Sequence, residues 1–472
     1  MKIDPREAAF LRCSYTDPNG RVFRWQGGLY RAVRGPLVAQ RYRQLLESGA
    51  ATRLEAAGLV ETRITDLSLD GYDLVLKHRE MPFVSYDFEW CADMLREAAL
   101  VTCDLNLELA AHGLVTQDAH SKNILFDGGR AVFVDFGSIV PLESNAPWGS
   151  YDEFRRWFLY PLQLMAAGHG RVARALLLCN RHVAVRKEDL FSLRPAPSHA
   201  AQIRAVKDRI ANGARKIVPQ ALHPAARKAL RALRRLRFSV EEASLPMPAQ
   251  IQRLRRAIEA IPLAHPKTTW SGYYDGRFPA FSPSDDWTPK HRSVWEVLTR
   301  TRPKTVLDIG SNRGWHAQLA ARLGSQVVTF DTDETCAAQL YHDAREARLP
   351  LLPLLMDIGN PTPGWGICNN MCPPATERFR CDMVFALALI HHLVFKQAFD
   401  FAQVVEGLSV FSNRRLLLEF VSADDKWARD WWSEKYAWYT RENLIACLRK
   451  SFSDVQVLPS HPEPRILLLC TK

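Results

Sequence analysis

The chain has 472 residues, of which 47% are hydrophobic, and it carries a formal net charge of +11 at pH 7. This length predicts roughly two to four domains, with ample apolar content for buried cores. We expect no membrane span, because no apolar run is long enough, and the charged stretch Met1 to Arg12 does not resemble a secretion signal. The ten cysteines lack framework spacing, which predicts free thiols and a cytoplasmic location.

The positive charge is concentrated in one stretch. Residues 201–240 hold eleven Lys and Arg residues and one acidic residue, Asp208, so neither flanking region needs to be basic. Basic helices within residues 201–256 could contact nucleic acid, an anionic lipid surface or an acidic partner. Charged runs are more often solvated surfaces, and we favour that interpretation.

The N-terminal region predicts a small sheet and two helical stretches. Strands are expected at residues 22–25 and 29–33 around a glycine turn, and at residues 74–76. A helical stretch follows the second strand over residues 35–57. A long helix with apolar residues at helical intervals is expected over residues 93–111.

The next segment carries a pattern of polar residues that suits phosphoryl transfer. Asp118 is followed five residues later by Asn123, then by a strand pair and by Asp135-Phe136-Gly137. One carboxylate can accept a hydroxyl proton, while an amide oxygen and a second carboxylate can hold magnesium against phosphates. The segment resembles the C-terminal lobe of the kinase-like superfamily. That resemblance implies Asp118 as catalytic base, Asn123 and Asp135 as magnesium ligands, and ATP as a cofactor.

Other parts of the kinase pattern are missing. No G-x-G-x-x-G loop precedes the segment, and Lys2 and Lys77 are the lysines before it, with Lys77 lying late. Arg31 or Arg34 could supply the missing cation. We therefore favour an α+β kinase-like domain of unproven activity over residues 1–194. The alternatives are a pseudokinase that binds nucleotide or nothing, and an active kinase of a small molecule or sugar.

Residues 195–289 are expected to connect this region to a second one. Prolines open the stretch, basic helical segments follow, and an aromatic, turn-rich lead-in ends it.

The Cys368 and Cys372 pair further on has a spacing seen in some metal sites, with Cys381 and His391 as conceivable further ligands. No second close pair completes the pattern, which favours free cysteines.

The stretch from Thr305 to Asp331 predicts a strand, a tight turn, a helix and a second strand that ends in an acidic residue. Asp308, Gly310, Asn312 and Gly314 form the pattern D-x-G-x-x-x-G, and Asp331 follows Gly310 by 21 residues. A dinucleotide fingerprint needs a glycine where Asn312 stands, so a ligand without a phosphate at this turn fits better. This stretch resembles the first motif of class I S-adenosylmethionine-dependent methyltransferases.

The rest of the chain continues that pattern. Strands are expected at residues 351–356, 415–420, 454–458 and 465–470, and from Cys381 onward, with helices between the earlier ones. Such alternation predicts a parallel sheet with helices on both faces. The resemblance thus covers residues 290–472 and implies an α/β Rossmann-like fold with a seven-stranded sheet. It implies S-adenosylmethionine contacts at six residues: Asp308, Gly310, Asn312, Gly314, Asp331 and Asp357.

Two histidines follow the fourth predicted strand of this region. His391 and His392 would face the reacting atoms, where they could orient or deprotonate a hydroxyl group. We predict them as catalytic residues. The alternative is that one of them caps the loop or packs against the cofactor.

The order of the two regions carries a further resemblance. A kinase-like region followed by a methyltransferase-like one is similar to a group of bacterial methyltransferases among the host-specific nodulation proteins, through residues 84–90 and 388–393. Bacterial polysaccharide chain terminators pair the two activities in the opposite order. The resemblance implies methyl transfer to a small molecule, glycan or glycolipid.

Two other functions remain open. The first is a kinase or pseudokinase whose methyltransferase-like domain is a binding module. The second is a nucleic-acid methyltransferase that uses the basic connector. The sequence Ala388-Leu389-Ile390-His391-His392 speaks against the second, because enzymes that methylate base nitrogens commonly carry an Asn/Asp-Pro-Pro-aromatic pattern there.

Overall fold

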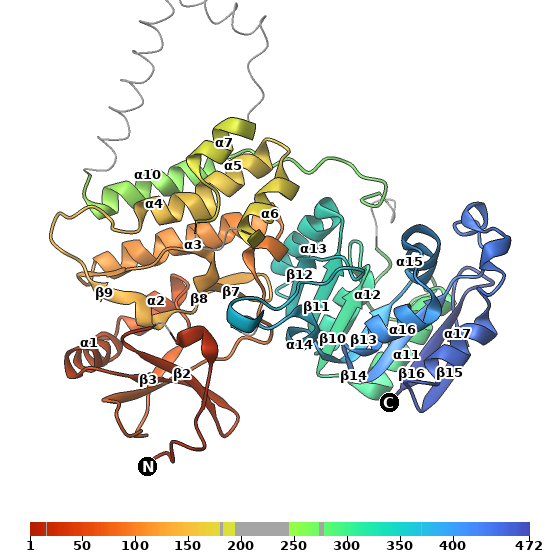
Figure 1. The fold of residues 1–472 in the computed structure, drawn as a ribbon, viewed down its shortest axis with the longest axis horizontal. Coiled ribbons are helices and arrows are strands. Elements are labelled where there is room, and N and C mark those ends of the chain that lie inside the picture. The colour runs from red at the N-terminus through yellow and green to blue at the C-terminus, as the bar shows by residue number, and fades with distance from the viewer. Residues whose placement is uncertain (16, 180–182, 194–244, 273–277, 370) are drawn as a thin grey trace, which may run out of the picture. The chain divides into compact units, whose positions relative to one another are not determined.

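The computed structural model describes residues 1–15, 17–179, 183–193, 245–272, 278–369 and 371–472 (Figure 1). The basic stretch 201–240 lies outside these described residues. The chain divides into two compact units. Unit 1 comprises Met1–Ala98, Lys122–Gly137 and Ala264–Lys472, and unit 2 comprises Ala99–Ser121 and Ser138–Leu263. The division into 1–194, 195–289 and 290–472 stays a prediction.

The larger sheet of unit 1 has seven strands in the order β12-β11-β10-β13-β14-β16-β15. Neighbours from β12 to β14 run parallel, whereas β16 is antiparallel to both β14 and β15. The strands are β10 (Thr305–Ile309), β11 (Gln326–Asp331), β12 (Leu351–Leu355), β13 (Cys381–Ala386), β14 (Ser412–Phe420), β15 (Asp454–Pro459) and β16 (Ile466–Thr471).

Helices precede, connect and flank the strands of this sheet. They are α11 (Pro289–Thr301), α12 (Trp315–Arg322), α13 (Glu334–Glu346), α14 (Ala375–Arg378), α15 (Ile390–Gln397), α16 (Phe401–Ser409) and α17 (Arg441–Leu448). The chain runs outward from β10 to β12 and then returns to β13 on the other side of β10. Because parallel crossovers are right-handed, this reversal places α12 and α13 on one face and α15 and α16 on the other. Accordingly, α11 packs on α12, and α16 packs on α15 and α17.

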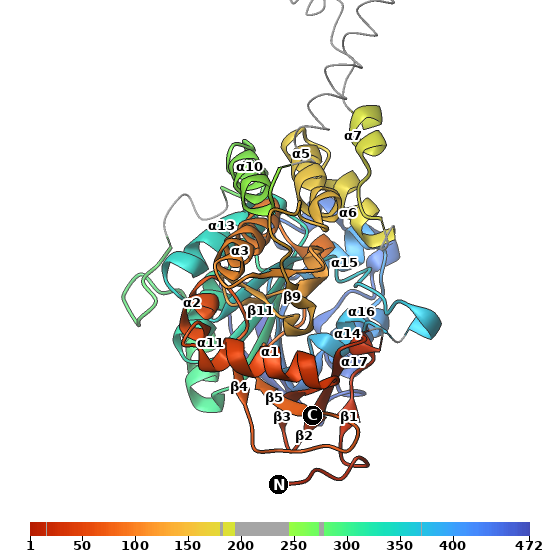
Figure 2. The same ribbon diagram turned by 90° about the vertical axis from the view of Figure 1, so that its left-hand side faces the viewer.

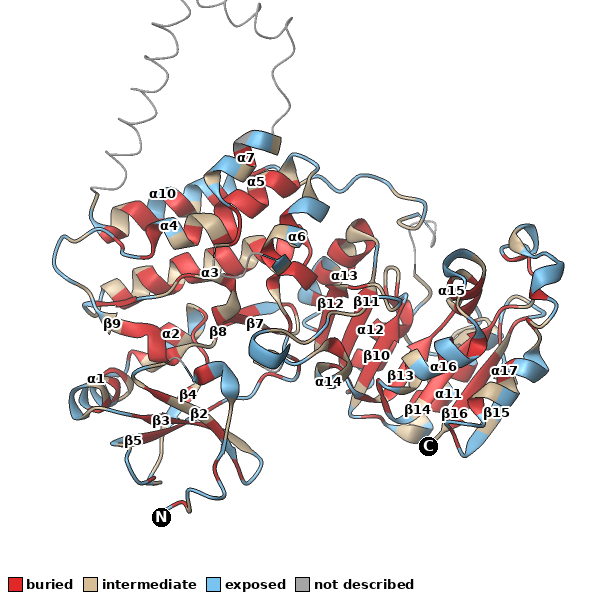
Figure 3. Cartoon of the chain, in the orientation of Figure 1, coloured by how far each residue is buried: buried red, intermediate tan, exposed pale blue. Residues whose placement is uncertain are grey.

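The reversal also creates a switch point between β10 and β13, where the loops after the two strands diverge. Its strands are buried on both faces, as the red sheet in Figure 3 illustrates. Such strands need continuous apolar runs, and Met383-Val384-Phe385-Ala386 supplies one. The core beside it includes the fully buried Trp315 and Leu417. A rigid sheet therefore supports the loops at its carboxyl edge.

Unit 1 also contains a five-stranded antiparallel sheet in the order β1-β2-β3-β5-β4. Its strands are β1 (Ala9–Phe10), β2 (Gly20–Trp25), β3 (Gly28–Val33), β4 (Thr62–Ile64) and β5 (Leu74–His78), and a separate hairpin joins β7 (Ile124–Asp127) to β8 (Arg130–Phe133). The predicted strands at residues 22–25, 29–33 and 74–76 are confirmed by β2, β3 and β5.

The predicted helical stretch over residues 35–57 is confirmed, but it is divided into two helices. The chain forms α1 (Pro36–Glu47), which lies beside β4 in Figure 2, and then α2 (Ala51–Ala56). Gly49 between them has a φ of 76°, a left-handed backbone conformation that a helix cannot continue through.

Unit 2 is mainly helical. It holds most of α3 (Ala92–Ala110), then α4 (Tyr151–Phe154), a π-helical turn (Arg155–Leu159), α5 (Tyr160–Ala166), α6 (Gly170–Cys179), α7 (Lys187–Leu193) and α10 (Met247–Glu259). A two-stranded ribbon pairs β6 (Leu114–Thr116) with β9 (Ile139–Pro141). Among the described residues, no helix is both long and apolar enough to cross a bilayer. All ten cysteines are free, as the sequence predicts.

Candidate functional site

The turn after β10 has the backbone geometry that the sequence predicts for a ligand-binding loop. Gly310, Asn312 and Gly314 have φ values of 74°, 53° and 72°, all in the left-handed region. A Cβ at Gly310 would lie 3.2 Å from Leu389 Cδ1, and one at Gly314 would lie 2.6 Å from Leu340 Cδ2. Glycine is therefore required at Gly314 for packing, and at Gly310 it leaves the main chain accessible to a ligand.

Asp331 ties this turn to the end of the adjacent strand. Its Oδ2 accepts a hydrogen bond of 2.6 Å from the Asn312 backbone nitrogen, and its Oδ1 accepts one of 2.9 Å from the Asp333 nitrogen. Each carboxylate oxygen can accept a second bond. Burial nevertheless raises the pKa of Asp331, because the charged form is poorly solvated. A ligand hydroxyl that donates to this carboxylate would stabilise its charge.

A set of charges lies under the turn. Asp308 is buried, and burial raises its pKa to about 7, with the Lys290 charge opposing the shift and Asp331 adding to it. Lys290 Nζ lies 2.6 Å from Glu419 Oε2, and Ser460 Oγ donates to Glu419 Oε1 at 2.6 Å. These residues come from β10, α11 and β14, so the sheet brings them to one edge. A cationic ligand bound near this group would favour the ionised form of Asp308.

Three buried serine and histidine atoms in this region have no hydrogen-bond partner among the residues that the structure describes. They are Ser311 Oγ, His316 Nδ1 and His391 Nδ1. Ser311 lies in the glycine turn, His316 is the second residue of α12, and His391 lies in the first turn of α15 after β13. Buried polar groups are almost always paired in native proteins. All three follow β10 or β13, so they lie near the switch point, where a polar ligand or a bound water could pair with them.

The two predicted histidines form an aromatic cluster. The His391 and His392 ring centroids are 4.2 Å apart, and Trp431 stacks on His391 at 5.9 Å with an interplanar angle of 14°. Trp270 lies against His392 at 5.4 Å. Burial lowers the pKa of His391 to about 3 and that of His392 to about 4, with nearby cations adding to the shift. Both rings are therefore neutral at pH 7 and are weak bases.

Asp357 follows β12, two strands away from the switch point. Its Oδ1 accepts a 2.9 Å hydrogen bond from the Gly359 nitrogen, which fixes the start of the following loop. The side chain is partly exposed. It thus lies at the same carboxyl edge as Asp308 and Asp331, because β10, β11 and β12 are parallel.

The predicted magnesium ligands have a different environment. Asp135 Oδ1 accepts a 2.9 Å bond from Arg31 Nη2 and a 3.1 Å bond from the Gly137 nitrogen. Arg31 is buried and also forms an ion pair with Asp17. The single Arg31 guanidinium is thus shared by two carboxylates, and a magnesium ion would have to compete with it for Asp135 Oδ1.

The remaining residues of the kinase-like pattern lie in different units. Asn123 is buried in unit 1, and its Nδ2 has no partner among the described residues. Asp118 follows β6 in unit 2.

Several residues of the carboxyl edge are absent from the sequence-based prediction. Lys290 and Glu419 are 129 positions apart, and no local pattern marks them as a pair. Trp270 O accepts a 3.0 Å bond from Asn312 Nδ2 across 42 positions. The aromatic composition of residues 270–287 was the one available signal, and it does not identify a single contact.

The fold and the site together define a doubly wound α/β sheet with a glycine turn and an acidic strand end at its switch point. The chain is similar to the nodulation protein NoeA of Rhizobium meliloti (strain 1021). The two are 25% identical over 438 residues, which cover 88% of this chain and 86% of that protein. The predicted resemblance to nodulation proteins is thus confirmed. No protein-family model matches the chain.

Solved structures that resemble part of the chain include three proteins. One is magnesium protoporphyrin IX methyltransferase from Synechocystis with bound SAH, at 16% identity over 38% of this chain and 81% of that one, with a TM-score of 0.28. Another is the bifunctional kinase-methyltransferase WbdD, at 17% identity over 38% of this chain and 37% of that one, with a TM-score of 0.28. The third is TehB from Haemophilus influenzae, at 14% identity over 43% of this chain and 67% of that one, with a TM-score of 0.30. TM-scores this low carry no argument about function.

Proposed function

We propose that residues 290–472 bind S-adenosylmethionine at the carboxyl edge of the seven-stranded sheet and transfer its methyl group to an acceptor. The observation that carries the proposal is the turn at Gly310, with the Asp331 carboxylate bonded to its backbone at 2.6 Å. In doubly wound sheets, ligands bind at such a switch point, and an acid at the end of the second strand accepts from ribose hydroxyls.

The residues at this edge fit the chemical parts of this cofactor. Asp331 would accept from the ribose, and the partly exposed Asp357 would accept from the adenine amino group. The turn from Gly310 to Gly314 would approach the rest of the molecule with its backbone. Asp308 lies below the turn, where its carboxylate would balance positive charge. The absence of a glycine at Asn312 fits a ligand without a pyrophosphate.

The cofactor supplies a methyl group on a positively charged sulfur. An acceptor held at this edge would receive that methyl group as the carbon–sulfur bond breaks, with the electron pair left on sulfur and the proton of a hydroxyl acceptor released to water. The protein contributes mainly position and exclusion of water. His391, neutral and buried beside Trp431, can accept a hydrogen bond at Nδ1 and so orient an acceptor hydroxyl. Its lowered pKa argues for orientation rather than full proton removal.

We propose a small molecule, glycan or glycolipid as the acceptor, by analogy with the bacterial polysaccharide chain terminators that pair the two activities. A hydroxyl acceptor would fit the unpaired imidazole nitrogen at His391. Kinase activity at Asp118, Asn123 and Asp135, with ATP and magnesium, is not part of this proposal, because Arg31 already pairs with Asp135.

Isothermal titration calorimetry with S-adenosylhomocysteine tests the proposal. Wild type should bind one equivalent. Asp331→Asn keeps the shape of the side chain but removes its charge, and should weaken binding by about tenfold or more, which corresponds to about 1.4 kcal/mol. Glu346→Gln, an exposed change of the same kind at the end of α13, should bind as wild type does. Equal affinities in wild type and Asp331→Asn would contradict the proposed site.

A further inference from the structure

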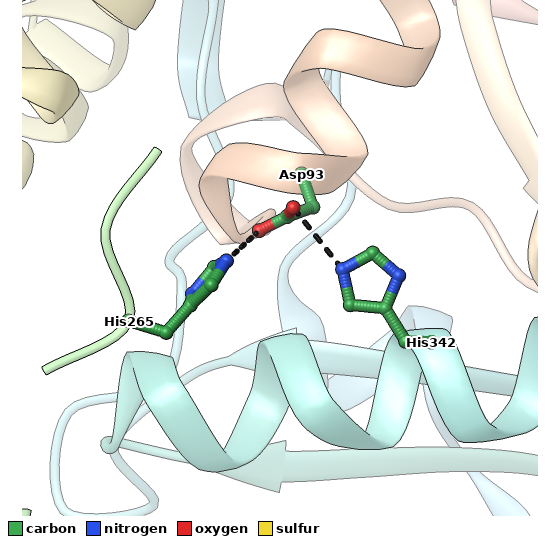
Figure 4. A group of neighbouring side chains, drawn as sticks. All are labelled: Asp93, His265 and His342. Carbon is green, nitrogen blue, oxygen red and sulfur yellow. Dashed lines mark hydrogen bonds and ion pairs between the residues drawn. The ribbon is translucent and has the colours of Figure 1, made fainter. Parts of the chain in front are cut away.

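A second group of potential ligands lies in unit 1, apart from the glycine turn. Asp93 in the first turn of α3, His342 on α13 and His265 in the segment before α11 converge on one point (Figure 4). His342 Nε2 lies 3.1 Å from Asp93 Oδ1, and His265 Nε2 lies 3.2 Å from Asp93 Oδ2. One ligand atom from each side chain lies within 4.8 Å of the other two.

We propose that Asp93, His265 and His342 form a binding site for a divalent transition metal, with zinc as the ion that the donor set fits best. Two imidazole nitrogens and one carboxylate are a recurrent set for zinc and its neighbours in the first transition row. Magnesium and calcium prefer oxygen ligands alone. Nothing in the proposal depends on the identity of the ligand at the glycine turn.

The distances fit this ion. In a tetrahedral site with bonds of about 2.0–2.1 Å, ligand atoms lie roughly 3.3 Å apart. The two contacts to Asp93 are close to that value, and small rotations of the imidazoles would bring their nitrogens together. The two exposed histidine side chains provide an entry path, with 33% and 56% exposure for His265 and His342. Three protein ligands would leave a position for water.

A second observation comes from the Asp93 carboxylate, which is 9% exposed. Its Oδ2 is buried and lacks hydrogen-bond geometry to any described residue, although His265 Nε2 lies 3.2 Å away. At this separation, a cation bound by both side chains could replace their ion pair. The nearby Arg345 charge is balanced by Glu97 at 2.7 Å, which limits its repulsion of a metal.

The site would fix the segment that leads into the seven-stranded region. His265 belongs to no helix or strand, whereas Asp93 and His342 lie on helices. The next residue, Pro266, accepts a 2.9 Å bond at its carbonyl from Thr335 Oγ1 on α13. A metal at the triad would therefore pin this irregular segment to both α3 and α13.

Zinc binding by tag-free, chelator-treated full-length protein tests the proposal by competition with a chromophoric zinc indicator. Wild type should bind one zinc ion per chain at a site that the variants Asp93→Asn, His265→Ala and His342→Ala each weaken. The expected loss is at least about tenfold, since even loss of support around a ligand costs that much. His112→Ala, a partly buried histidine outside the triad, should bind as wild type does. Equal zinc affinity in all five proteins, or none in wild type, would overturn the proposal.

Cobalt substitution separates this site from the ten cysteines. Cobalt(II) in the triad should give visible absorption without a thiolate-to-metal charge-transfer band, and His342→Ala should abolish it. A thiolate band in wild type would instead assign the metal to cysteines and overturn the proposal. Thermal unfolding of the metal-free variants should match metal-free wild type. If Asp93→Asn or His342→Ala does not fold, His265→Ala still tests zinc binding, because His265 lies outside the helices and strands.

Discussion

At the scale of single residues, Gly310 is where backbone conformation and ligand approach coincide. Alanine at a left-handed position costs about 1–2 kcal/mol, and at Gly310 its Cβ would also meet Leu389. We predict that Gly310→Ala loses stability of this size and binds S-adenosylhomocysteine about tenfold more weakly, or worse. Urea denaturation and calorimetry measure the two effects separately.

Gly324 provides the matched control for this substitution. It also has a left-handed φ, of 98°, but a Cβ there meets open space after α12. Gly324→Ala should lose similar stability and keep full affinity for the ligand. If both variants bind as wild type does, the turn is not a ligand contact.

The buried carboxyl of Asp308 should make stability depend on pH. Its pKa is about 7 in the folded protein and 3.8 ordinarily, so the folded state holds the proton more tightly. This stabilisation is complete below pH 4 and is lost as the pH rises to about 7, at about 1.4 kcal/mol for each unit of pKa difference. Asp308→Asn has no such proton. Relative to this variant, ligand-free wild type should therefore lose stability between pH 4 and 7.

Urea denaturation of wild type and Asp308→Asn across that pH range measures both the sign and the size of this change in stability. Parallel profiles would mean that Asp308 is solvated or paired in the folded protein. A wild type that gains stability relative to Asp308→Asn as the pH rises would mean that its pKa is lowered.

At the scale of elements, a buried ion pair holds the loop before β13. Arg378 at the end of α14 donates to both oxygens of Glu89, at 2.6 and 3.0 Å, and to the Val84 carbonyl at 2.6 Å. Both charged side chains are nearly inaccessible, at 3% and 1% exposure. Removing one partner of such a pair leaves the other charge buried, which typically costs about 3–5 kcal/mol.

We predict that Arg378→Met is destabilised by about this amount and that adding Glu89→Gln recovers part of the loss. Arg380→Met changes an exposed arginine two residues later and should unfold close to wild type. Chemical denaturation of the three variants and wild type measures these differences in the free energy of unfolding. A loss in Arg378→Met no larger than that in Arg380→Met would show that the pair contributes little.

The elements themselves were largely predictable where local signals agree. The alternation from β10 to β14 followed from buried apolar runs, glycine turns and helical periodicity, which are properties of neighbouring residues. The break between α1 and α2 at Gly49 was missed, because apolar spacing on both sides matches one helix. The contact of Arg378 with Glu89 joins residues 289 positions apart and leaves no trace in local sequence.

At the scale of the whole molecule, three sets of polar residues within the described part of the chain differ in their chemistry. The carboxyl edge around Gly310 was predictable, because its residues follow strand ends in a fixed order. The pairing of Asp135 with Arg31 was not, although the sequence indicates both residues. The triad of Asp93, His265 and His342 could not be predicted at all, since its members are scattered and none belongs to a motif.

The central claim is that an adenosyl cofactor binds at the turn after β10. Amide hydrogen exchange followed by mass spectrometry, with and without saturating S-adenosylhomocysteine, tests it most directly. We predict slower exchange in peptides that cover residues 309–314 and 331–333, and no such protection with ATP and magnesium. Unchanged exchange in those peptides, or protection confined to the residues around Asp135, would contradict the claim.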